Sequence, residues 1–232
     1  MQEMAYALGW VVVFILSVTV HEAAHAWAAM AGGDPTAYAG GQVSFNPVPH
    51  IKREPFGMLV LPLLSAFLIG WPFGYASSPY DPAWAYKYPR KAAWMALAGP
   101  AANLLMVVAG AGLIKLGILA GVFAWPVSVD FTHVVDGGSS GIWFGLSVFL
   151  SMMFTLNLIL FILNLLPLPP LDGSGIVSLF LKEDSARAYR KWVSNPLFGF
   201  IGILLAWQVF SPLFDRAFPL VLNLLYPGSH FQ

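Results

Sequence analysis

The chain of 232 residues contains no cysteine and very little charge. Without cysteine it has no disulfide framework, no thiolate nucleophile and no thiolate metal site, so a metal would have to bind His, Asp or Glu. Only 9% of the residues are charged, whereas a soluble domain carries roughly a quarter. The high apolar content, 58%, also excludes a disordered chain. We therefore expect an integral membrane protein.

The formal net charge is zero, and no long basic run occurs. Because contacts to phosphates need clustered Lys and Arg, we expect no nucleic-acid partner. No polar linker divides the chain, so we expect residues 1–232 to form a single integral-membrane domain. The sequence carries no signal for an oligomeric state.

Three long apolar stretches, 5–31, 92–122 and 141–166, are each long enough to cross about 30 Å of hydrocarbon. Shorter apolar stretches at 198–210 and 219–226 add one or two further segments. We expect Gly99-Pro100 to interrupt the second long stretch. The predicted fold class is an all-α multi-pass membrane protein with three core transmembrane helices and one to three further helices.

Residues 34–91 contain a region that we expect to be re-entrant. Residues 36–45, with Gly40-Gly41 at their centre, read as two short strands about a tight turn, which predicts a β-hairpin. Residues 57–69 are apolar but short for a crossing, and the Pro/Gly-rich stretch 70–82 follows as a return path. Non-helical backbone at membrane depth should line a cavity.

The distribution of Lys and Arg predicts the orientation. Basic residues at 87–91 and 182–191 belong in the cytoplasm, and the acidic 125–140 loop belongs outside. The third long helix then descends, which places Asp172 at its cytoplasmic end.

The segment His21-Glu22-Ala-Ala-His25 lies inside the first apolar stretch. On a helix, residues i and i+4 share one face, so both imidazoles can bind one zinc ion. Glu22 is then placed to accept a proton from water that the metal activates. A structural alternative is that these side chains only form hydrogen bonds between helices, but three ionisable groups in five residues are costly in a membrane.

A catalytic zinc keeps three protein ligands, so a third ligand is needed. Asp172 is a candidate because it follows a long apolar helix and a Pro-rich break. His50 and His133 are alternatives in expected loops, and Asp172 could instead belong to a plain Asp-Gly turn.

Several motifs resemble the site-2 protease family of intramembrane zinc metalloproteases, peptidase family M50, in its compact prokaryotic branch without a PDZ domain. They are HExxH at 21–25, AGPxxN at 98–103, N-x-x-P-x-P-x-x-D-G at 164–173 and G-x-x-x-S-x-N-P-x-x-H at 40–50. The resemblance implies that His21, His25 and Asp172 bind one Zn²⁺ per chain and that Glu22 is the catalytic acid/base. It also implies that Asn164 helps to hold the substrate or the oxyanion.

The resemblance further implies hydrolysis of a peptide bond in or near a transmembrane segment of a membrane protein. The expected location is a prokaryotic inner membrane, with the active site toward the cytoplasm. The chain departs from the family pattern at Lys52-Arg53, at Ser174 and at Pro72, none of which is an expected ligand.

Other interpretations remain for some of these residues. A membrane cation or metal transporter also uses intramembrane His, Glu and Asp, although these groups would be spread along the crossings. A catalytically silent membrane protein on the same scaffold is a third possibility. We expect the side chains of Asn103 and Asn157 to form hydrogen bonds between helices. Asn164 either supports a metal ligand or contacts the substrate.

Overall fold

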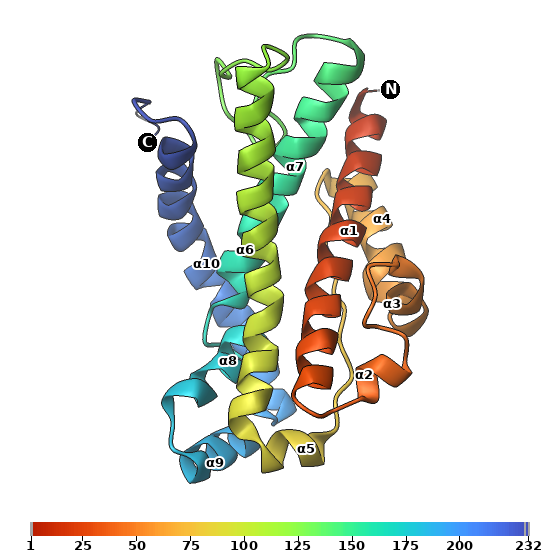
Figure 1. Cartoon of the computed structure of the whole chain (residues 1–232), viewed down its shortest axis with the longest axis vertical. Coiled ribbons are helices and arrows are strands. Elements are labelled where there is room, and N and C mark those ends of the chain that lie inside the picture. The colour runs from red at the N-terminus through yellow and green to blue at the C-terminus, as the bar shows by residue number, and fades with distance from the viewer. Residues whose placement is uncertain (1, 230, 232) are drawn as a thin grey trace.

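The computed structural model describes residues 2–229 and 231, and its regular structure is helical (Figure 1). The helices are α1 (Gln2–Ala31), α2 (Thr36–Ala39), α3 (Pro47–Arg53), α4 (Leu61–Ile69), α5 (Pro82–Lys87), α6 (Pro89–Leu119), α7 (Gly141–Asn164), α8 (Asp172–Ile176), α9 (Glu183–Val193) and α10 (Pro196–Leu225). A π-helical turn, Phe56–Val60, precedes α4, and a 3₁₀ turn, Val177–Phe180, follows α8. Within the described residues, four helices are long and apolar enough to cross a membrane: α1, α6, α7 and α10.

The three long helices predicted from the sequence are present as α1, α6 and α7, and α10 adds a fourth. Helix α6 continues through Gly99-Pro100, so the expected interruption is wrong. Helix α10 likewise runs through Pro212 and Pro219, so the apolar stretches 198–210 and 219–226 form one segment, of the one or two expected. Proline leaves backbone carbonyl groups of a helix without a hydrogen-bond donor, and such unpaired groups are costly in lipid. Membrane helices tolerate proline where neighbouring groups supply the missing hydrogen bonds.

Helices α1, α6 and α7 pack against one another and form the centre of the molecule. One buried apolar cluster lies between α1 and α7 and includes Trp10, Phe14 and Met152. This packing fixes the position of α1, which carries the HExxH segment.

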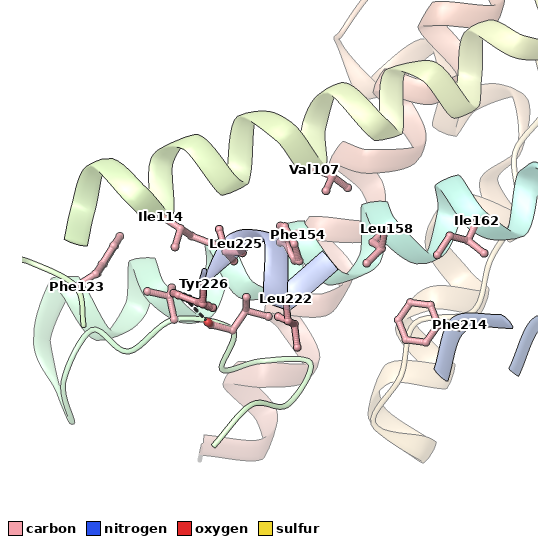
Figure 2. Close-up of a cluster of buried hydrophobic side chains, with 12 residues drawn as sticks. Val107, Ile114, Phe123, Phe154, Leu158, Ile162, Phe214, Leu222, Leu225 and Tyr226 are labelled. Atoms are coloured by element: carbon pink, nitrogen blue, oxygen red, sulfur yellow. Dashed lines mark hydrogen bonds between the residues drawn. The ribbon is translucent and has the colours of Figure 1, made fainter. Parts of the chain in front are cut away.

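A second buried cluster joins α6, α7 and α10 toward the end of the bundle where both termini lie (Figures 1 and 2). Ile114, Phe154 and Leu222 meet there, beside the 121–136 loop. The hydroxyl of Tyr226 donates a hydrogen bond of 2.7 Å to the carbonyl oxygen of Val134, and so ties the end of α10 to that loop.

The β-hairpin expected at 36–45 is wrong. Residues 36–39 form the helical turn α2, and the described residues 40–46 form turns and irregular backbone with no strand. The carboxylate of Asp34 accepts hydrogen bonds from the backbone N–H and the hydroxyl of Thr36, which stabilises a helical start there. Burial alone would raise the pKa of Asp34, but the hydrogen bonds from Thr36 and Asp81 lower it below its ordinary value. Gly41, at φ 73°, then redirects the chain.

Residues 57–69, expected to enter the membrane and return through 70–82, lie alongside α1, and the chain then runs back along it. Helix α4 packs on α1, and an extended segment then descends to α5 at the other end of the bundle (Figure 1). Several hydrogen bonds hold the return segment, among them one from Tyr75 N–H to the Gly57 carbonyl at 3.1 Å and one from the Ser78 hydroxyl to the Glu22 carbonyl at 2.8 Å. The non-helical backbone therefore lies beside the HExxH turn.

Helix α10 packs against the loop between α7 and α8 at Gly202, where an added Cβ would collide with the carbonyl oxygen of Pro169. We predict that Gly202→Ala lowers the free energy of unfolding by about 1–3 kcal/mol, the usual cost of overpacking. Thermal unfolding of the detergent-solubilised chain measures this. Gly199→Ala is the matched control, because open space surrounds Gly199 on the same helix. Equal stability of the two variants would contradict the packing described.

Candidate metal centre

His21, Glu22 and His25 lie in the C-terminal half of α1 and are all buried, with 5–7% of each residue exposed. Each offers one possible ligand atom, and these three atoms lie within 4.8 Å of one another. The arrangement follows from helix geometry, because positions 21 and 25 are one turn apart. Three ionisable groups thus share one small volume inside an apolar bundle.

Asp172 lies close to the two histidines, although it comes from a distant part of the chain. After α7 ends at Asn164, a Pro-rich loop turns the chain back so that Asp172 begins α8. This return requires a residue without a side chain at position 173, since a Cβ on Gly173 would collide with the carbonyl oxygens of Leu165 and Leu166. The carboxylate oxygens of Asp172 come to lie 3.0 Å from His21 Nε2 and 3.3 Å from His25 Nε2.

Hydrogen bonds determine which nitrogen of His25 carries the proton. His25 Nδ1 is 2.7 Å from the backbone carbonyl oxygen of Met95. A carbonyl can only accept, so Nδ1 is the N–H donor and Nε2 of the neutral ring is unprotonated.

The tautomer of His21 follows from a buried chain of three side chains. The amide nitrogen of Asn157 donates to the Met153 carbonyl at 2.8 Å, so its oxygen must face Asn103. The amide nitrogen of Asn103 therefore donates to Asn157, also at 2.8 Å, and its oxygen faces His21 Nδ1 at 2.6 Å. His21 Nδ1 is then the donor, and its Nε2 is unprotonated as well.

The resulting site needs a cation. In the neutral rings the two unprotonated Nε2 atoms lie 2.9 Å apart and face a carboxylate, so their lone pairs converge. Glu22 Oε2 and Asp172 Oδ2 are buried and have no hydrogen-bond partner among the described residues. Buried acceptors without donors are costly unless a metal satisfies them, and two imidazoles with a carboxylate are a zinc ligand set. The donor set therefore fits a zinc ion.

Gly99 of α6 keeps this space open. A Cβ at position 99 would lie against the Nε2 atoms of both His25 and His21, the latter at 2.5 Å. Glycine is thus required where α6 passes the Nε2 atoms of His21 and His25.

The other candidate residues lie elsewhere. His50 is buried in α3 and its Nε2 is 3.0 Å from the Ser44 carbonyl, while His133 pairs with Asp130 in the 121–140 loop. Neither belongs to the metal-binding group found in the described residues. Asn164 ends α7, and its side chain forms no hydrogen bond with the four residues of the centre.

The role of Asn103 was missed by sequence reasoning, which treated it and Asn157 only as a hydrogen bond between helices. The two side chains do bond each other across α6 and α7, but Asn103 also holds His21. Its position four residues after Gly99 places both on one face of α6, but no local spacing in the sequence shows that this face meets His21.

A polar cavity of about 270 Å³ opens beside the centre. Glu22, His25 and Asp172 form one side of it, and Ser78 and Arg190 contribute to the rest. A peptide could therefore reach the metal-binding residues from this side.

We predict that Gly99→Ala abolishes or strongly weakens zinc binding, because the new methyl group occupies the space between the two Nε2 atoms. Zinc content of the purified protein measures this by elemental analysis. Gly112→Ala, on the same helix with open space around it, should retain zinc. Normal zinc content in Gly99→Ala would show that the ion does not sit where His21, His25 and Asp172 converge.

We also predict that Asn103→Leu lowers zinc affinity by about 10–100-fold, the usual effect of losing the partner that orients a ligating histidine. Asn157→Leu should have a smaller effect, since it acts through Asn103. Competition titration with a zinc chelator measures both. An unchanged affinity in Asn103→Leu would rule out the orienting role.

Comparisons with known proteins identify a zinc metalloprotease family. The family model for peptidase family M50 matches residues 9–206. The Bacillus subtilis (strain 168) protein named "Putative zinc metalloprotease YwhC" is 34% identical over 195 residues, which cover 84% of this chain and 77% of that protein. "Putative zinc metalloprotease Rip2" of Mycolicibacterium smegmatis is 33% identical over 184 residues, which cover 78% of this chain and 58% of the relative. No solved structure matches the chain.

Proposed function

The chain belongs to peptidase family M50, and we propose that His21, His25 and Asp172 hold the zinc ion of this membrane metalloprotease while Glu22 is its acid/base. The observation that carries the assignment is the convergence of two unprotonated Nε2 atoms and one carboxylate within 3.3 Å of one another. Asp172 is preferred to His50 and His133 as the third ligand, because its carboxylate lies within 3.3 Å of both Nε2 atoms, whereas the two histidines contact Ser44 and Asp130 instead.

The reaction is hydrolysis of a peptide bond. Zinc in this site supplies Lewis-acid activation of water and of the scissile carbonyl. Glu22 lies next to the ligands in sequence, lines the cavity and has an unpartnered buried oxygen, so its carboxylate can accept the proton of the attacking water. The same carboxyl group then passes that proton to the leaving amine.

Hydrogen bonds keep the two histidines oriented for this step. Asn103 and the Met95 carbonyl hold the two imidazoles with their Nε2 lone pairs toward the ion. A histidine that could rotate or exchange tautomers would spend part of its time unable to bind, so these contacts raise metal affinity.

The proposed substrate is a transmembrane segment of another membrane protein. The centre is formed by α1 and α8 and contacts α6, in a chain with four helices of membrane-spanning length, so a peptide that reaches it comes from the bilayer or its surface. A helical segment has its carbonyls in intrahelical bonds and must unwind before attack. Asn164 is proposed as a substrate contact rather than as support for a ligand, since it is not bonded to the centre.

We place the active site toward the cytoplasmic side of a prokaryotic inner membrane. Basic residues gather at the end of the bundle that holds α5 and α9, the end where the zinc-binding helix α1 finishes (Figure 1). They include Lys87 at the end of α5 and Lys191 in α9. Cytoplasmic loops carry such an excess.

A cation transporter has no support in the comparisons, which name zinc metalloproteases. The geometry also argues against it, since His21, Glu22, His25 and Asp172 gather at one place instead of lining a path across the bundle.

We predict that Glu22→Gln retains zinc but reduces peptide hydrolysis by at least about 100-fold, because the amide cannot accept the proton of the attacking water. Cleavage of a membrane-protein substrate in detergent or liposomes measures this, with zinc content determined on the same preparation. Glu3→Gln, at the exposed start of the same helix, should cleave normally. Cleavage by Glu22→Gln at the wild-type rate would remove Glu22 from the mechanism.

A further inference from the structure

Arg190 reaches the catalytic cavity from a helix outside the motifs discussed so far. It lies on α9, an amphipathic helix at the same end of the bundle as α5 (Figure 1). The cavity of about 270 Å³ that Glu22, His25 and Asp172 line is also lined by Arg190. The guanidinium is thus placed beside the reaction site.

Within the described part of the chain, no carboxylate lies within ion-pair distance of Arg190, whose side-chain partner is the neutral hydroxyl of Tyr80. One turn earlier on the same helix, Arg187 pairs with Glu183 at 2.9 Å and with Asp184 at 2.8 Å. Burial lowers the pKa of Arg190, but a guanidinium stays charged at neutral pH. A partly buried cation without an anionic partner has lost part of its hydration and is free to bind an anion.

The charge balance of the centre makes Arg190 a surplus charge. Two neutral histidines, the carboxylates of Asp172 and Glu22 and one Zn²⁺ sum to zero. Arg190 therefore adds a net positive charge to a neutral site, which favours an anionic group arriving with the substrate.

Arg190 also stands where two cavities meet. A second cavity, of about 400 Å³, shares Tyr80 and Arg190 with the first and extends to Lys191. A peptide that passes between the cavities in an extended form advances about 3.3 Å per residue. Its side chains a few residues from the scissile bond would then pass the guanidinium.

We propose that Arg190 is a specificity-determining residue that binds an acidic side chain of the substrate, a few residues from the scissile bond. A guanidinium can bind a carboxylate through two parallel hydrogen bonds, which gives direction as well as attraction. The inference rests on the proposed function, because it assumes that the cavity receives the substrate peptide.

The test measures binding rather than cleavage. The full chain carrying Glu22→Gln is titrated, with zinc bound and in detergent, with labelled peptides of about 20 apolar residues. One Glu, Gln or Lys is moved residue by residue along the last two turns of the peptide. At one or two adjacent positions, Glu should lower the Kd about tenfold relative to Gln, or about 1.4 kcal/mol.

Substitutions of Arg190 should change this preference in a defined way. Added to Glu22→Gln, Arg190→Gln should make the Glu and Gln peptides bind equally, and Arg190→Glu should favour the Lys peptide instead. Arg187→Gln, on the same helix but outside both cavities, should keep the preference for Glu. Zinc content should be the same in all variants.

Three results would overturn the proposal. They are no position at which the Glu peptide binds more tightly than the Gln peptide, a preference for Glu that survives Arg190→Gln, or an equal loss of binding of all peptides in Arg190→Gln together with loss of zinc. The last result would mean that Arg190 only supports the fold. Failure of the proposed function is a different result: the chain with Glu22 intact would bind these peptides but hydrolyse none of them.

Discussion

The centre of this protein is organised by a conflict between lone pairs that a cation resolves. Two imidazole nitrogens and a carboxylate face one another within 3.3 Å in the interior of a membrane bundle. Protonation of an imidazole would also relieve the conflict, but Asn103 and the Met95 carbonyl hold the Nδ1 protons in place, so the neutral rings present both Nε2 lone pairs to a metal ion. The buried hydrogen bonds thus orient both histidines as a metal-binding pair.

The surrounding fold is arranged to maintain that convergence. The packing of α1 between α6 and α7 positions the two histidines, and the Pro-rich loop after α7 brings Asp172 back to them. Glycine occurs where backbone must approach closely: at Gly99 beside the ligand nitrogens, at Gly173 beside the end of α7 and at Gly202 beneath the Pro-rich loop. Each of these contacts would be lost with the smallest added side chain.

Much of the architecture could be predicted from the sequence because membrane helices have a strong local signal. The length and apolarity of three stretches identified α1, α6 and α7, and the i, i+4 spacing of His21 and His25 indicated a metal pair. The β-hairpin at 36–45 was predicted wrongly, since strand-like residues around Gly40-Gly41 do not reveal that Asp34 starts a helix there. Local pattern also could not show that Asn103 meets His21, because that contact joins residues 82 positions apart.

The account is tested most directly by X-ray absorption spectroscopy at the zinc edge on the purified chain. It predicts one zinc per chain, with two imidazole nitrogens and oxygen ligands at about 2.0–2.2 Å, and one fewer imidazole in His21→Ala. A chain that binds no zinc, or a zinc environment that is the same in wild type and His21→Ala, would contradict it.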